Sequence, residues 1–186
     1  MCMNSKLMKD TLFGAVGGFA GTYVLEKTMG LLTRFQSNRD KWIERELVKE
    51  EPTSALARRA AKTALGKELP EDQVKQLGNA VHWGYGIFWG AVYGVLRNRV
   101  PAISAGGGFP FGVALDVFGE GMLLPAFKLS PPATQFPVST HLRDMTAHYA
   151  YAATTECVCA TLSAVSEALS RTERGPRTKR ELREVS

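Results

Sequence analysis

Six ionisable side chains stand inside otherwise apolar stretches of the sequence, and their types could support proton or ion chemistry. They are Glu26, His82, Asp116, Glu120, His148 and Glu156. A carboxylate or an imidazole changes its charge when it binds a proton, and both groups are also metal ligands. Because such groups are costly in an apolar environment, each is expected to be a functional residue or a partner for another polar group.

Three uses of these residues are open. The simplest is mutual neutralisation, in which neighbouring carboxylates share protons and lock a bundle of helices. The second is the handling or sensing of protons or ions, and the third is a metal or haem site built on His82 and His148. Metal sites in helical bundles usually contain Glu-x-x-His pairs, and the sequence has none. We therefore predict no metal and no cofactor.

No catalytic motif identifies the chain as an enzyme. The run of glycines at 106–108 lacks the Lys and Ser or Thr that complete a phosphate-binding loop. A G-x-S-x-G nucleophile turn is also missing from the sequence. We therefore predict no catalytic residues.

Four Gly-rich apolar segments carry the six ionisable residues, and each is about as long as a bilayer is thick. They cover residues 12–33, 79–96, 102–124 and 145–169. This pattern predicts an all-α fold, an integral membrane bundle of about four transmembrane helices in a single domain over residues 1–170. Pro110 predicts a kink in the third segment, which could instead be re-entrant.

Glycines recur at every fourth position within these segments. A spacing of four places residues on one face of a helix, where a second backbone can approach closely. An interior glycine costs a soluble helix about 1 kcal/mol relative to Ala, so a repeated glycine needs a packing reason. We expect helix-packing faces at Gly14, Gly18, Gly86, Gly90, Gly94, Gly108 and Gly112.

The depth of the ionisable residues follows from the order of the segments. If four spans alternate in direction, the end of the first, the start of the second, the end of the third and the start of the fourth share one side. Five of the six residues fall in those half-spans, and Glu156 stands in the middle of the fourth span. We expect Glu26, His82, Asp116, Glu120 and His148 to form one interior cluster.

The remaining charges are concentrated outside the apolar segments. Residues 34–77 and 171–186 hold 16 of the 23 Lys and Arg residues, and in 34–77 ten basic residues are mixed with eight acidic ones. This mixture is typical of a solvated helical surface and argues against a nucleic-acid partner, despite the net charge of +5. We predict a peripheral amphipathic helical segment at 34–77. Residues 171–186 are predicted to form a basic disordered tail near lipid headgroups.

Short motifs along about two thirds of the chain resemble the YagU-like family, small uncharacterised inner-membrane proteins of bacteria. The motifs lie in Gly14 to Glu26, His82 to Gly86, Trp89 to Gly94, Glu120 with Leu124-Pro125, Leu129 to Pro132, and His141 to Glu156. The resemblance implies a helical bundle in the bacterial plasma membrane. It implies no established activity and no catalytic residues.

Three classes of function remain compatible with the sequence. The chain is a membrane protein that handles or senses protons or ions, a structural or scaffold subunit of a membrane complex, or a soluble helical interaction protein with a Gly-rich core. For the membrane classes we expect the lipid bilayer as a partner, together with a homo-oligomer or another membrane protein. The dense basic tail favours both termini in the cytoplasm.

Overall fold

The computed structural model describes residues 2–174, and every regular element among them is helical. Three long helices form the framework: α1 (Cys2–Phe35), α4 (Glu71–Arg97) and α7 (Val138–Arg174). Each extends beyond the span predicted from the sequence. Helix α7 continues through residues 171–174, which the sequence assigns to the tail, and residues 175–186 of that tail lie outside the described residues.

The third apolar segment is broken into several short helical pieces. It consists of η1 (Pro101–Ser104), α5 (Ala105–Leu115), the π-helix η2 (Asp116–Leu123) and α6 (Leu124–Ala126). The chain bends at Gly106, Gly107 and Gly108, whose φ angles of 57°, 70° and 87° are left-handed. Glycine adopts such angles without steric cost. The bend therefore lies at these glycines, whereas the sequence predicted a kink at Pro110.

The polar segment between the first two long helices contains two short helices. Helix α2 (Asn38–Leu47) begins after Ser37, whose side chain accepts a hydrogen bond from the Asp40 amide, and α3 (Pro52–Leu65) ends at Gly66 in a left-handed conformation. Helix α2 therefore has a capping residue at its start, and α3 has one at its end. A further short turn, η3 (Ala133–Gln135), precedes α7.

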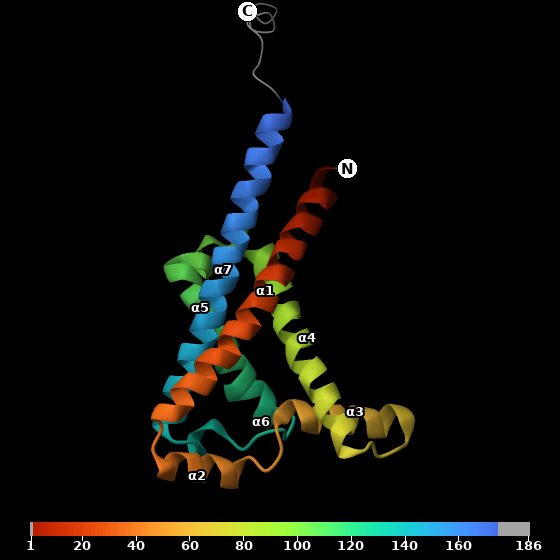
Figure 1. The fold of residues 1–186 in the computed structure, drawn as a ribbon, viewed down its shortest axis with the longest axis vertical. Coiled ribbons are helices and arrows are strands. Elements are labelled where there is room, and N and C mark those ends of the chain that lie inside the picture. The colour runs from red at the N-terminus through yellow and green to blue at the C-terminus, as the bar shows by residue number, and fades with distance from the viewer. Residues whose placement is uncertain (1, 175–186) are drawn as a thin grey trace, which may run out of the picture.

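The long elements alternate in direction along the bundle (Figure 1). The beginning of α1 and the end of α7 lie at one end, and α2, α3 and the chain between α6 and α7 lie at the other. Helix α1 packs between α4 and α7, and α5 packs on α7. The end of α1, the start of α4, η2 and the start of α7 therefore share the end of the bundle that carries α2 and α3.

Glycines make the closest helix contacts. A Cβ atom added to Gly18 would lie 2.8 Å from the Cα of Gly90, and one added to Gly14 would lie 2.9 Å from the Cα of Gly94. Between α5 and α7, a Cβ atom on Gly112 would lie 3.0 Å from the Cα of Tyr149. These distances leave no room for a larger side chain, because carbon atoms in contact stand about 3.5–4.0 Å apart.

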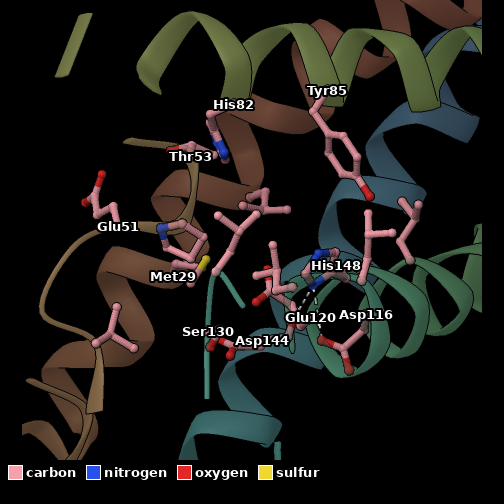
Figure 2. A pocket seen from close by; sticks show the side chains of 18 of the residues that line it. Met29, Glu51, Thr53, His82, Tyr85, Asp116, Glu120, Ser130, Asp144 and His148 are labelled. Carbon is pink, nitrogen blue, oxygen red and sulfur yellow. Dashed lines mark hydrogen bonds and ion pairs between the residues drawn. The ribbon is translucent and has the colours of Figure 1, made fainter. Parts of the chain in front are cut away.

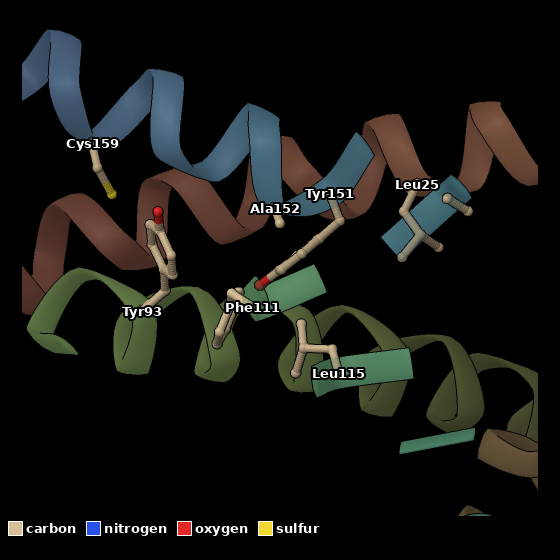
Figure 3. Close-up of a cluster of buried hydrophobic side chains, with 8 residues drawn as sticks. Leu25, Tyr93, Phe111, Leu115, Tyr151, Ala152 and Cys159 are labelled. Atoms are coloured by element: carbon tan, nitrogen blue, oxygen red, sulfur yellow. The ribbon is translucent and has the colours of Figure 1, made fainter. Parts of the chain in front are cut away.

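A small apolar core lies where α1, α4, α5 and α7 meet. It contains Leu25, Tyr93, Phe111, Leu115, Ala147, Tyr151, Ala152 and Cys159 (Figure 3). The Tyr151 hydroxyl donates a hydrogen bond of 2.6 Å to the Gly86 carbonyl, and this bond joins α7 to α4. Large apolar side chains outside the core are exposed, among them Phe19, Phe88, Phe118 and Met122.

One helical segment among the described residues, Pro101–Ala126, is long and apolar enough to cross a membrane by length and composition. Only 22% of its most apolar stretch is buried, whereas the core helix of a soluble protein is mostly buried. The segment is weak evidence for membrane association.

Candidate functional site

A cavity of about 1470 Å³ occupies the end of the bundle that carries α2 and α3. Its walls come from α1, α4, η2 and α7. The start of α3 and the loops beside it form part of the rim (Figure 2). Apolar atoms form most of the surface that lines it, including those of Leu25, Met29, Tyr85, Trp89 and Leu115, and polar or charged residues are about as numerous in the lining. A cavity of this size has room for a small organic molecule.

Four of the sequence-predicted residues form two pairs in this cavity. The Nε2 atom of His82 on α4 lies 3.3 Å from Oε1 of Glu26 on α1. The Nδ1 atom of His148 on α7 lies 3.3 Å from Oδ1 of Asp116 in η2. Each pair becomes a salt bridge when the imidazole is protonated, so the cavity holds two proton-sensitive contacts between different helices.

Glu120 is the fifth residue of the predicted cluster, and it projects into the same cavity (Figure 2). Its side chain is exposed at the cavity, although protein atoms surround the carboxyl group at close range. Three other carboxylates of the cavity, those of Glu26, Asp116 and Asp144, each lie beside a histidine or arginine. Glu120 has no hydrogen bond or ion pair to any residue in the described part of the chain.

The four-residue spacing explains why Asp116 and Glu120 share one side. In the π-helix, as in an α-helix, residues four apart project in similar directions. The segment contains Gly119 and Gly121, which leave space around the carboxylates, and the Tyr85 hydroxyl would stand 3.4 Å from a Cβ atom on Gly119. Tyr85 therefore approaches η2 from α4, next to Glu120.

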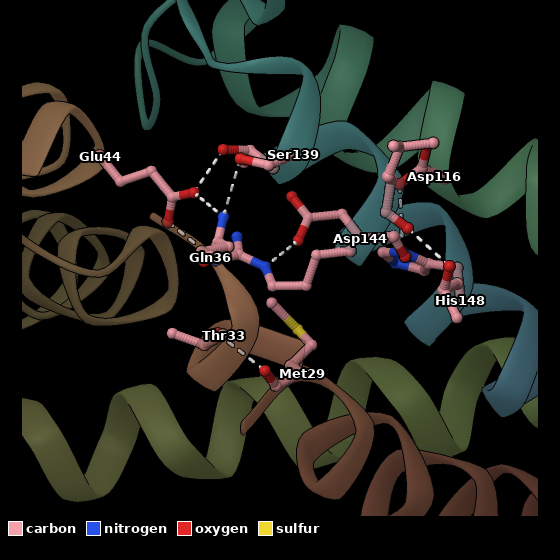
Figure 4. A network of polar contacts seen from close by, with 12 residues as sticks. Met29, Thr33, Gln36, Glu44, Asp116, Ser139, Asp144 and His148 are labelled. Atoms are coloured by element: carbon pink, nitrogen blue, oxygen red, sulfur yellow. Dashed lines mark hydrogen bonds and ion pairs between the residues drawn. The ribbon is translucent and has the colours of Figure 1, made fainter. Parts of the chain in front are cut away.

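A polar network closes the outer end of the site and joins α2 to α7 (Figure 4). Arg143 donates hydrogen bonds of 2.8 Å to Glu44 and 2.7 Å to Asp144. Gln36 donates a bond of 2.6 Å to Glu44, and the Thr140 hydroxyl makes a further short contact with the same carboxylate. The network fixes the peripheral helix α2 against the start of α7.

The pKa values of Glu44 and Asp144, two carboxylates of this network, are shifted in opposite directions. Burial opposes ionisation of Glu44, but hydrogen bonds from Thr140, Arg143 and Gln36 outweigh it and hold the pKa of Glu44 below its ordinary value. Burial raises the pKa of Asp144, although Arg143 favours its ionised form. Asp144 is therefore the carboxylate of the network that accepts a proton more readily.

Glu156, the sixth predicted residue, lies apart from the other five. Its carboxylate accepts hydrogen bonds from Arg97 and from the Tyr93 hydroxyl, toward the end of the bundle where α1 begins. The sequence analysis placed Glu156 in the middle of the fourth span and named no partner for it, because Arg97 stands in what reads as a short basic turn. The spacing of Tyr93 and Arg97, four residues apart on one helix, is the signal that points to a shared partner.

Three further participants were absent from the predicted site. Arg143 and Glu44 belong to polar segments that read as solvated surface, and Tyr85 reads as one aromatic residue among several. All three line the cavity in the folded chain. Only the tertiary contact between α2 and α7 reveals the roles of Arg143 and Glu44.

Comparison with known proteins gives a family but no activity. The family described as "Protein of unknown function (DUF1440)" matches residues 52–157, which is more than half of the chain. The chain belongs to the DUF1440 family. No curated protein and no solved structure matches it. The DUF1440 match contains α3, α4, the broken segment and the first half of α7, so it includes His82, Asp116, Glu120 and His148 but not Glu26.

Proposed function

We propose that this protein is a YagU-like, multi-pass protein of the bacterial inner membrane that takes up and releases protons in the cavity between its helices. The observation that carries the proposal is the position of Glu120, whose carboxyl group is exposed at the cavity and has no hydrogen bond or ion pair within the described part of the chain. A carboxylate without a fixed counter-charge at low dielectric gains the most from binding a proton.

The membrane location is supported by the surface of the helices. Large apolar side chains such as Phe19, Phe88, Phe109, Phe118 and Met122 are exposed on four different elements. Soluble monomers rarely expose large continuous apolar surfaces, whereas lipid-facing helices require them. The close glycine contacts between α1 and α4 are of the kind that drives helix association in a bilayer.

The proton-binding groups are arranged around Glu120. His148 lies on the α7 side of the cavity with its partner Asp116, and His82 lies on α4 with its partner Glu26. When one of these histidines is protonated, its carboxylate partner compensates the charge, and the ion pair also ties two helices together. Proton uptake at the cavity therefore changes the contacts between α1 and α4 and between η2 and α7.

Infrared spectroscopy tests the proposal directly, because a protonated carboxylic acid has a carbonyl band that the carboxylate lacks. The purified protein in lipid nanodiscs is titrated from acidic to alkaline pH, and we expect a carbonyl band that disappears with rising pH. Glu120→Gln should remove a component of that band. Glu167→Gln, a change at an exposed position of α7, is the matched control and should leave the band intact.

Two outcomes count against the proposal. An identical titration of wild type and Glu120→Gln shows that Glu120 does not exchange protons. Complete release of the protein from membranes by a carbonate wash shows that it does not span the bilayer.

A further inference from the structure

The cavity is larger than proton exchange requires. Protons need a chain of polar groups or a few water molecules, whereas this cavity has a volume of about 1470 Å³ and is open on one side. A drug-sized molecule occupies a pocket of about 300–1,000 Å³. The space beside Glu120 is therefore sufficient for an organic ligand, and the charges and rings around it define the chemistry of that ligand.

Charge around Glu120 favours a cation. Asp116 in η2 and Asp144 on α7 also face Glu120, and the positive groups that face it are His148 and Arg143 on α7. Both positive groups already have carboxylate partners, since His148 lies 3.3 Å from Asp116 and Arg143 binds Glu44 and Asp144. On the far side, Glu26 stands beside His82. Among the carboxylates of Glu26, Asp116, Glu120 and Asp144, that of Glu120 is the one that the described residues leave without a direct partner.

Aromatic rings stand beside the same carboxylate. The Tyr85 hydroxyl lies beside Gly119, the neighbour of Glu120 in η2, and the Tyr85 ring meets that of Trp89 edge to face at 6.0 Å between centroids. Trp89 also packs against Phe118 of η2 at 6.3 Å. An organic cation is attracted to the faces of tyrosine and tryptophan rings. Because apolar groups surround its charge, moving it out of water costs less free energy than moving a metal ion.

Resting on the proposed function, we propose that the cavity binds a hydrophobic organic cation, whose charge pairs with Glu120 and whose apolar groups pack against Tyr85 and Trp89. A proton and the organic cation then compete for the same carboxylate. Binding of the cation releases a proton from Glu120, and protonation of Glu120 at acidic pH releases the cation. The cavity opening and the exposed apolar surface of η2 would let such a ligand enter from the bilayer.

Tetraphenylphosphonium is a suitable probe, because it is a permanent cation surrounded by aromatic groups. Its affinity for the full chain in nanodiscs is measured by isothermal titration calorimetry at neutral and at acidic pH. We expect binding at neutral pH that weakens on acidification. Glu120→Gln should lower the affinity about tenfold or more, because it removes the charge that faces the ligand. Glu167→Gln is the matched control and should bind as wild type does.

Two further measurements keep the proposal testable if Glu120→Gln folds poorly. Glu120→Asp retains the charge and should retain binding and its pH dependence. Neutral triphenylphosphine oxide has a similar apolar surface without the charge, and it should bind at least about tenfold more weakly than the cation.

Three results would overturn the inference. Equal affinity of wild type and Glu120→Gln removes Glu120 as the binding group. Equal affinity for the cation and the neutral probe shows that the cavity accepts an apolar occupant such as a lipid chain. Absence of cation binding, together with a normal infrared titration of Glu120, removes the ligand but leaves the proposed proton exchange standing.

Discussion

Arg97 and Glu156 join α4 to α7 through two parallel hydrogen bonds, of 2.6 Å from Nη2 to Oε1 and 2.8 Å from Nε to Oε2. Both side chains are mostly buried, with exposed fractions of 15% and 19%. The Tyr93 hydroxyl donates a third hydrogen bond to the same carboxylate at 2.5 Å. This pair lies away from the cavity, so it is a structural contact that can be altered without changing the proposed site.

Removing one partner of this pair should destabilise the bundle. Glu156→Gln leaves the Arg97 charge without a counter-charge in a mostly buried position, and loss of one member of a buried pair costs about 3–5 kcal/mol. We expect a lower thermal unfolding midpoint in detergent for Glu156→Gln and for Arg97→Met. The double variant should recover part of the loss, because it leaves no unpaired charge. Additive losses in the double variant would contradict a direct interaction.

The glycine contacts lead to a second prediction that uses two residues of the same helix. A Cβ atom on Gly90 overlaps the backbone of Gly18, whereas one on Gly84 meets no atom within 4 Å. Gly90→Ala should therefore separate α1 from α4 and lower the unfolding midpoint. Gly84→Ala should be neutral or stabilise by about 0.5–1 kcal/mol, because Ala favours a helix more than Gly does. Equal midpoints for the two variants would show that the α1 and α4 contact does not exist.

The sequence predicted much of the helical framework but not its interruptions. Apolar segments and four-residue glycine spacing gave four helical regions, because both patterns depend on local periodicity. The bend at Gly106–Gly108 and the π-helix at Asp116–Leu123 depend on how the third segment fits against α7, which no local pattern encodes. Helices α1 and α7 exceed their predicted spans for another reason. The predicted spans end where charged residues begin, and charged residues do not end a helix.

The same distinction applies to the cavity residues. His82 and His148 stand out in a sequence because ionisable residues in apolar segments are rare, and alternation of direction placed them at one end. Arg143 and Glu44 are unremarkable in polar segments, and their pairing needs α2 to fold back onto α7. Depth along the helix already set Glu156 apart from the other five, but its pairing with Arg97 depends on how α4 packs against α7.

The network around Glu44 predicts that acid releases α2 from α7. The pKa of Glu44 is lowered in the folded chain, so its ionised form contributes stability that is present above the ordinary pKa near 4.5 and is lost as pH falls through the lowered value. The protection factors of the α2 amides, which compare observed with intrinsic hydrogen exchange at each pH, should therefore fall on acidification below that range. Glu44→Gln should show the low protection already at neutral pH. Unchanged protection of α2 in this variant would contradict the network.

Asp144, in the same network, contributes to the pH dependence of stability with the opposite sign. Its pKa is raised, so its ionisation costs stability as pH rises from the ordinary value of 3.8 through the raised one. Asp144→Asn removes this cost but also one partner of Arg143. We expect this variant to keep the acid-induced release of α2, because Glu44 still titrates. Loss of the acid response in Asp144→Asn would assign that response to Asp144.

The alternating directions of the long elements predict where two lysines lie relative to the bilayer. Lys6 stands near the start of α1, and Lys67 follows α3 at the opposite end of the bundle; both are exposed. In a variant without the native cysteines, Lys6→Cys and Lys67→Cys are treated in intact spheroplasts with a membrane-impermeant maleimide. If α1 crosses the membrane with its start in the cytoplasm, only the cysteine at 67 reacts. After the membranes are permeabilised, both cysteines should react, which controls for accessibility. Labelling of the cysteine at 6 alone reverses the orientation but keeps the crossing, and labelling of both positions in intact cells shows that α1 does not cross the bilayer.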